Sequence, residues 1–172
     1  MFIQFREKSI FISMAEQKAN DEPEQSPAAK NDAALLSATL KNTKVFGFKD
    51  FTVDAKVVKV YDGDTCTCVF DTFNMGLYRH QIRLNGIDTA EIKSKDADVK
   101  ALALRTRDFV ADLILNKIVQ LTCEGSDKYG RILGIIRIDG VCINDLLIEK
   151  KMALPYDGGT KTLFDAKHEN AV

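Results

Sequence analysis

Turn-forming dipeptides divide the middle of the chain into short segments, and this punctuation limits the folds that it can adopt. Three pairs each favour a tight turn: Asp62-Gly63, Asn85-Gly86 and Asp139-Gly140. Between and beyond them, alternating or β-branched apolar residues predict five strands, at 51–61, 65–70, 78–84, 117–123 and 132–138. Residues 87–89 are too short for a convincing return strand, so a bend or bulge is expected there.

Two helical patterns interrupt the strands. Residues 96–116 place Val99, Leu102 and Thr106 on one face, and acidic residues in the first turn suit the positive end of a helix dipole. A shorter helix is expected at 145–152, with Asn144 as its cap. The order is three strands, a helix, two strands and a helix. This order predicts a mainly β fold with helices (α+β), a five-stranded Greek-key barrel of the OB type with two to three helices.

The length of 172 residues suits one domain with an additional tail. Residues 15–34 are polar, lack aromatic residues and contain two of the three prolines, so they are expected to be disordered. The predicted organisation is a disordered or weakly ordered tail at 1–46, the barrel domain at 47–165 and a second tail at 166–172.

Amino-acid composition excludes few classes of function. The formal net charge of −1 argues weakly against a nucleic-acid binder, although a local basic face is compatible with it. The cysteines are Cys66, Cys68, Cys123 and Cys142. Without a C-x-x-C spacing they predict reduced, buried thiols, not a zinc site or a disulfide framework.

No segment has the length and apolar character of a membrane span or a signal peptide, because Arg6, Glu7 and Lys8 interrupt the apolar N-terminus. The expected location is the cytoplasm or an infected host cell, with no membrane association and no obligate protein partner. Met14 is an alternative start.

Three short polar segments contain the candidate site residues: Asp62-Gly63-Asp64-Thr65, the run 83–91, and Asp127-Lys128-Tyr129-Gly130-Arg131. Each segment taken singly has a structural explanation as a turn, a cap or a hairpin loop. Their combination suggests chemistry, because it supplies both oxygen ligands and arginines.

Asp64, Asp88 and the carbonyl of Thr89 offer the oxygen ligands that Ca²⁺ and Mg²⁺ prefer. Glu91 follows Asp88 by three residues, and its carboxylate suits the holding or deprotonation of an attacking water. Arg83 and Arg131 supply planar forks that match phosphate geometry. A phosphoryl centre that gains negative charge in its transition state is an appropriate target for this set.

The three segments, in this order and with a helix between the last two, resemble the staphylococcal nuclease (thermonuclease-like) family over about residues 57–156. The resemblance implies an OB-fold, one Ca²⁺ per active site and hydrolysis of DNA and/or RNA with little sequence specificity and 3′-phosphate products. By the family motif, Asp64, Asp88 and Thr89 hold the cation, and Arg83, Glu91 and Arg131 are catalytic.

The same resemblance places Lys128 and Tyr129 near the terminal phosphate of the nucleotide, and Tyr156 is a candidate base-stacking platform. The chain departs from the family at Ala90, where proline is usual, which predicts a looser loop around Glu91. The C-terminal helix of the family is barely visible in residues 162–168.

Two other functions remain open at this point. A binding module on the same barrel would have no reason to keep the carboxylates, the glutamate and both arginines. An unrelated single-strand binder would use aromatic residues on the second and third strands, with Phe70, Phe73 and Tyr78 as candidates. The basic residues Lys93, Lys95, Lys100, Arg105 and Arg107 suit the solvated side of a helix better than a phosphate-binding face. His80 is expected on a strand surface and not as a catalyst.

Overall fold

A computed structural model describes residues 27–159 of the chain, which divides into two units, residues 1–45 and 46–172. The first unit contains helix α2 (Pro27–Ser37), in a region where the sequence predicted no regular structure. Four alanines in its eleven residues favour a helix locally. The side chains of residues 31–37 are exposed, so local propensity and not packing accounts for this helix.

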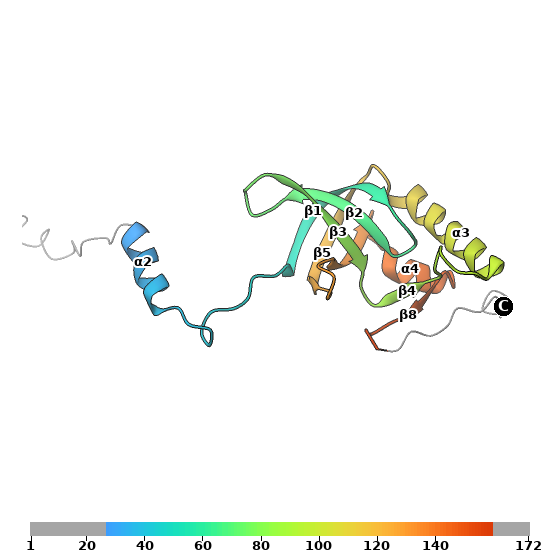
Figure 1. The fold of residues 1–172 in the computed structure, drawn as a ribbon. Helices are drawn as coiled ribbons and strands as arrows, with labels where there is room; N and C mark the ends of the chain where they lie inside the picture. Colours follow the sequence, from blue (N-terminus) through green and yellow to red (C-terminus); the bar gives the residue numbers. More distant parts are fainter. Residues whose placement is uncertain (1–26, 160–172) are drawn as a thin grey trace, which may run out of the picture. The chain divides into compact units, whose positions relative to one another are not determined.

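The second unit is built around a closed barrel. Its five strands are β1 (Lys49–Val60), β2 (Thr65–Asp71), β3 (Leu77–Leu84), β5 (Ile118–Ser126) and β6 (Ile132–Ile138). They run in the order β3-β2-β1-β5-β6, and a parallel pairing of β3 with β6 closes the barrel. Figure 1 labels β1, β2, β3 and β5 in this unit. Short β7 (Val141–Cys142) pairs antiparallel with the end of β6. The predicted five-stranded OB-fold is confirmed.

Strand alternation builds the core. On β2, Cys66, Cys68 and Phe70 are buried while the intervening residues are only half-buried. These side chains pack with those of β1, β5 and β6 in one cluster of buried apolar residues. Cys66, Cys68 and Cys123 are buried free thiols, as expected, and burial raises the pKa of Cys123 to about 11. Cys142 is a free thiol too, but it is only half-buried.

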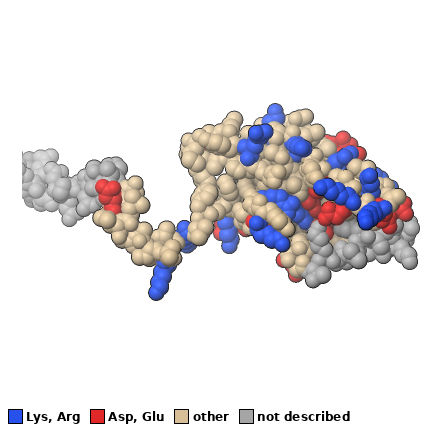
Figure 2. Space-filling view, viewed as in Figure 1, with Lys and Arg blue, Asp and Glu red and all other residues tan. Residues whose placement is uncertain are grey.

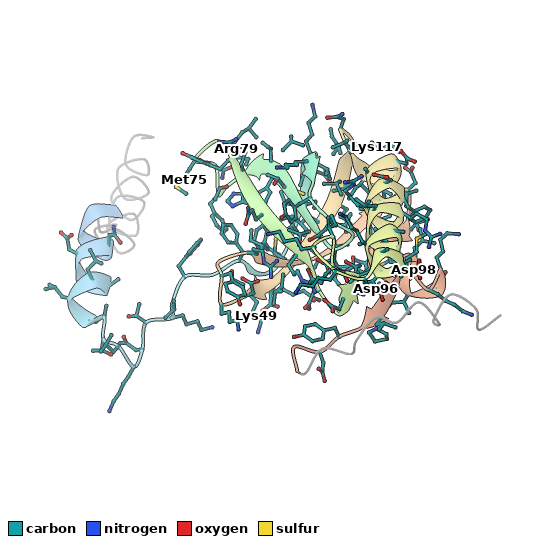
Figure 3. All side chains as sticks on the ribbon, turned by 45° about the vertical axis from the view of Figure 1, so that its right-hand side comes forward. Lys49, Met75, Arg79, Asp96, Asp98 and Lys117 are labelled. Atoms are coloured by element: carbon teal, nitrogen blue, oxygen red, sulfur yellow. The ribbon has the colours of Figure 1, made fainter. Side chains whose placement is uncertain are left out.

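Helix α3 (Ala97–Ile114) lies against the barrel and agrees with the predicted helix. Asp96 caps it by accepting hydrogen bonds from the backbone N–H groups of Asp98 and Val99 at 2.9 and 3.2 Å. Figure 3 labels Asp96 and Asp98 at this end of the helix and Lys117 beyond its other end. Buried Ile114 joins the barrel core, so the helix shares the core with the strands.

Two local predictions were wrong. Residues 87–89 form strand β4 (Ile87–Thr89), which pairs antiparallel with β8 (Ala153–Pro155). Its partner is distant in sequence, so a local pattern does not reveal the pairing. Helix α4 is Ile143–Glu149, and its N-cap is Cys142 without a side-chain hydrogen bond, not Asn144.

Asn144 instead lies buried inside α4 and connects three segments. Its side-chain oxygen accepts a hydrogen bond from the Ile136 N–H, and its Nδ2 donates to the carbonyls of Asn85 and Gly134. The turn that leads into β4 is therefore held against β6 and α4.

No helix within residues 27–159 is long and apolar enough to cross a membrane. The possible helix at 162–168 and the predicted tail at 166–172 lie outside the described residues.

Candidate active site

A cleft of about 590 Å³ opens at the end of β3, between the β1–β2 turn, the chain around β4 and the loop between β5 and β6. Eight of the nine residues predicted for the site line it: Asp64, Arg83, Thr89, Glu91, Lys128, Tyr129, Arg131 and Tyr156. The ninth, Asp88, does not line the cleft but contacts Arg83. The structure thus gathers three segments that are far apart in the sequence.

Arg83 joins the two carboxylates predicted to hold a cation. Its Nη1 lies 2.9 Å from Asp64 Oδ2 and its Nη2 lies 2.9 Å from Asp88 Oδ1. Nη1 also donates to the Leu84 carbonyl at 3.1 Å. All three charged side chains are buried. Because an unpaired buried charge is costly, the two carboxylates and the guanidinium each need the other as an ion-pair partner.

Asp64 is held by further donors. Its Oδ2 accepts hydrogen bonds from the Thr89 N–H at 3.1 Å and the Thr89 hydroxyl at 3.0 Å, and its Oδ1 accepts from the Thr65 hydroxyl at 3.0 Å. Burial raises the pKa of Asp64, and Asp62 adds to this, while Arg83 and the two threonine hydroxyls oppose it. The β1–β2 turn and β4 are thereby tied together through one carboxylate.

The β1–β2 turn approaches α3 very closely. A Cβ at Gly63 would lie 2.5 Å from Thr106 Cγ2 and 3.0 Å from the Thr89 Cγ2 and Oγ1 atoms. Only glycine permits this approach without a shift of the neighbours.

The segment after β4 carries Glu91 into the cleft. Ala90 is buried and packs with Val99, Leu102 and Ala103 of α3. This packing anchors the residue that precedes Glu91, and the looser loop that the sequence predicted stays a prediction. The Glu91 residue is itself exposed, as a group that meets substrate must be.

Asp127 shapes the loop that presents Arg131. Its Oδ1 accepts hydrogen bonds from the N–H groups of Tyr129 and Arg131, both at 2.9 Å, and its Oδ2 accepts from Arg131 Nε at 2.7 Å. Burial raises the pKa of Asp127, but hydrogen bonds from Arg131 and Tyr129 outweigh it and leave this pKa lowered. Arg131 is thus oriented at Nε, while its Nη1 approaches the Thr65 hydroxyl at 3.5 Å.

The two predicted tyrosines differ in availability. Tyr129 is 73% exposed, and the Arg131 guanidinium carbon and Lys128 Nζ lie 5.7 and 5.1 Å from its ring centroid. Tyr156 is half-buried, and its N–H donates to the Gly86 carbonyl while its hydroxyl donates to the Gly159 carbonyl. Tyr129 is therefore the more open ring.

Several other candidates lie elsewhere. Five basic residues of the α3 region line no part of the cleft: Lys93, Lys95, Lys100, Arg105 and Arg107. Phe70 is buried in the core, so it offers no stacking face. His80 is half-buried, stacks on Phe70 with ring centroids 4.4 Å apart and hydrogen-bonds the Thr72 hydroxyl at 2.9 Å. Figure 2 shows Lys and Arg side chains directly beside Asp and Glu side chains, so the visible face carries mixed charge.

Two residues that organise the site were not predicted from the sequence. Asp127 carries a signal that could have revealed it, because an aspartate four residues before an arginine in a Gly-containing loop is a recognisable turn former. Asn144 was interpreted as a helix cap, and only the tertiary structure shows its three partners.

The oxygen ligands available suit a hard divalent cation. Asp64 and Asp88 are two carboxylates on adjacent segments, joined through Arg83, and Thr89 adds a backbone carbonyl. No group of three or more His, Cys, Asp or Glu side chains placed to hold an ion occurs within residues 27–159. A cation here would consequently take most of its ligands from water and substrate. The threonine hydroxyls on Asp64 can rotate their hydrogens away to release acceptor positions.

A five-stranded barrel with a polar cleft of this kind is consistent with one family of known proteins, which comparison of the sequence with family models identifies. The family model described as staphylococcal nuclease homologue matches residues 81–171, more than half of the 172 residues. The chain belongs to the staphylococcal nuclease homologue family. The match includes Arg83, Asp88, Glu91 and Arg131 and begins after Asp64.

Two relatives agree with this assignment. An "Uncharacterized endonuclease" of Haemophilus influenzae is 33% identical over 101 residues, which are 59% of this chain and 51% of that protein. A "Micrococcal nuclease" of Shigella flexneri is 27% identical over 132 residues, 72% of this chain and 68% of that protein. The chain thus spans about half the length of the Haemophilus relative.

Proposed function

We propose that the protein hydrolyses phosphodiester bonds of DNA and/or RNA in the cleft around Arg83. The observation that carries the proposal is the convergence of Arg83, Glu91 and Arg131 on one cleft, beside two carboxylates that Arg83 joins. The names of the two relatives, an endonuclease and a micrococcal nuclease, support the same activity.

The residues divide the chemistry between charge stabilisation and proton transfer. Arg83 and Arg131 donate hydrogen bonds to the non-bridging oxygens of the phosphate, which gain negative charge as water attacks phosphorus. Both guanidinium groups are already oriented, Arg83 by its two aspartates and Arg131 by Asp127, so little ordering is needed at the reaction.

Glu91 acts as the general base. Its carboxylate takes one proton from the attacking water, the new P–O bond forms, and the bond from phosphorus to the 5′-oxygen breaks. The 5′-oxygen leaves with a proton from solvent, and the products are a 3′-phosphate and a 5′-hydroxyl. Contacts to phosphate alone carry no base information, so sequence specificity is low.

A single Ca²⁺ is the proposed cofactor, held by Asp64, Asp88 and the Thr89 carbonyl. When bound, it supplies positive charge that polarises the phosphate. Lys128 and Tyr129 line the cleft and are proposed to contact a terminal phosphate, and Tyr156, which also lines it, is proposed to stack on a base.

The test uses the full-length protein with end-labelled single-stranded DNA, duplex DNA and RNA, each with Ca²⁺ or with EDTA. We expect cleavage with Ca²⁺, none with EDTA, and recovery when Ca²⁺ is added in excess. Cleavage that survives complete chelation contradicts the cation, and binding without any cleavage identifies a binding module instead.

Glu91→Gln isolates the base, because it removes the proton acceptor and keeps the shape. Turnover should fall by about 10²–10⁴. Glu149→Gln, an exposed glutamate of α4, is the matched control and should behave as wild type. Equal turnover of the two variants eliminates Glu91 from the mechanism.

A further inference from the structure

Two shallow grooves continue the cleft across the outer face of β1, β2 and β3. A groove of about 200 Å³ shares Asp62, Thr65 and Arg131 with the cleft. A second groove of about 600 Å³ shares Lys59, Thr67 and Gln81 with the first. The three hollows therefore form one continuous path, and its part outside the cleft is called here the β1–β3 track.

Strand register aligns the residues of this path across the three strands, with one irregularity in β1 between Val57 and Lys59. Thr65 pairs with Arg83, Thr67 with both Lys59 and Gln81, and Val69 with Arg79, so outward side chains form successive rows across the three strands. Along β3, Arg83, Gln81 and Arg79 share one strand face at intervals of two residues, a step of roughly 6.6 Å, and Arg83 is the one buried at the cleft. That step is comparable to the length of one extended nucleotide.

The track has the chemistry of a nucleic-acid surface. Lys59 and Arg79 are exposed cations, and Figure 3 shows Arg79 on β3 with its side chain directed away from the barrel. Tyr61 is 52% exposed at the end nearer the cleft, with Lys59 Nζ 5.9 Å from its ring centroid. Of the described residues that line the two grooves, Asp62 alone is acidic.

We propose that the β1–β3 track binds an extended single strand and guides it into the cleft, with Lys59 and Arg79 contacting phosphates and Tyr61 stacking on a base. This inference rests on the proposed nuclease function, since the track continues the same cleft. A single strand fits better than a duplex because its bases are free to stack on Tyr61. An exposed aromatic ring with a lysine ammonium 5.9 Å from its centroid also distinguishes this surface from an ordinary solvated strand face.

Salt dependence of binding measures the phosphate contacts directly. A fluorescently labelled 12-nucleotide single strand is titrated with full-length Glu91→Gln protein, so that the strand stays intact, at several salt concentrations. The slope of log K against log salt is negative, and each lost phosphate contact reduces its magnitude by about 0.7 for single strands. The double variant Lys59→Ala/Arg79→Ala should therefore have a slope whose magnitude is smaller by roughly 1.4. The Glu91→Gln parent should accordingly lose about sevenfold more affinity than the double variant between ~50 and ~200 mM salt.

The matched control is Lys100→Ala/Arg137→Ala, which removes an exposed lysine of α3 and an exposed arginine of β6, both outside the track. It changes net charge equally and should leave the slope at that of the Glu91→Gln parent. Tyr61→Leu should weaken single-strand binding at least about fivefold and leave duplex binding unchanged. Urea unfolding of every variant checks that the fold is retained.

Equal slopes for the two double variants overturn the track proposal. So does undiminished single-strand binding by Tyr61→Leu. Binding of an oligoglutamate peptide as strong as that of the single-stranded oligonucleotide overturns it as well. Cleavage assays separate this from the nuclease proposal. The cleavage assays use proteins that keep Glu91. If the wild type cleaves nucleic acid and the Lys59→Ala/Arg79→Ala variant cuts long single strands equally well, the track proposal fails and the nuclease proposal stands. If binding depends on Lys59 and Arg79 but nothing is cleaved, the track stands and the nuclease fails.

Discussion

Gly63→Ala tests how the helix supports the site. The added Cβ would lie 2.5 Å from Thr106 Cγ2, and Thr106 is completely buried, with its hydroxyl donating to the Leu102 carbonyl at 2.9 Å. Overpacking of this kind costs about 1–3 kcal/mol. We therefore expect the free energy of unfolding to fall by roughly 2 kcal/mol.

A second substitution distinguishes a clash from other effects of alanine. Thr106→Ser removes the Cγ2 methyl, keeps the hydroxyl and should cost about 1 kcal/mol as a small cavity. In the double variant the Gly63→Ala methyl fills the space that Thr106 vacates. The free energy of unfolding of the double variant should therefore fall by ~1–2 kcal/mol, instead of the ~3 kcal/mol that two independent effects would give.

Urea unfolding followed by circular dichroism measures all four stabilities, with constant m values as the check on two-state behaviour. Gly47→Ala is the control, because no atom lies within 4 Å of its added Cβ, and its stability should change by less than about 0.5 kcal/mol. Strictly additive losses in the double variant would refute the clash with Thr106. Partial recovery of turnover in the double variant would show that the same contact positions Asp64.

Other residues of the site give three further predictions. Arg131→Lys should lower kcat/KM at least about tenfold, since an ammonium cannot replace the oriented fork, while loss of the Nε contact to Asp127 should cost less than about 1 kcal/mol of stability; near-normal kinetics contradict the phosphate clamp. Asn144→Ala should lower the free energy of unfolding by roughly 2–4 kcal/mol in urea titrations, because it leaves buried backbone groups unpaired; a loss below ~1 kcal/mol refutes its role as a hub. The pKa of Asp127 is lowered in the folded protein, so its contribution is present above the unfolded value of about 3.9 and is lost as pH falls through the folded value. The stability difference between wild type and Asp127→Asn should accordingly shrink below about pH 4, and a difference constant from pH 6 to 3 would contradict this.

Local sequence determines the elements whose partners are close or whose pattern is strong. The alternation at 65–70, the β-branched run at 132–138 and the amphipathic pattern around Val99 and Thr106 each predict an element that the structure contains. Short polar motifs also suffice to select eight residues that line one cleft. These signals are readable because side-chain periodicity follows from backbone geometry alone.

Only the tertiary structure decides features that depend on distant partners. Strand β4 exists because Ile87–Thr89 meets Ala153–Pro155, and Asn144 is a buried connector because Asn85 and Gly134 converge on it. The joining of Asp64 and Asp88 through Arg83, and the track that Lys59, Gln81 and Arg79 form, likewise require barrel closure and strand register. Such contacts join residues that are far apart along the chain. Side-chain periodicity reveals only which residues share a face of one element, so it does not predict these contacts.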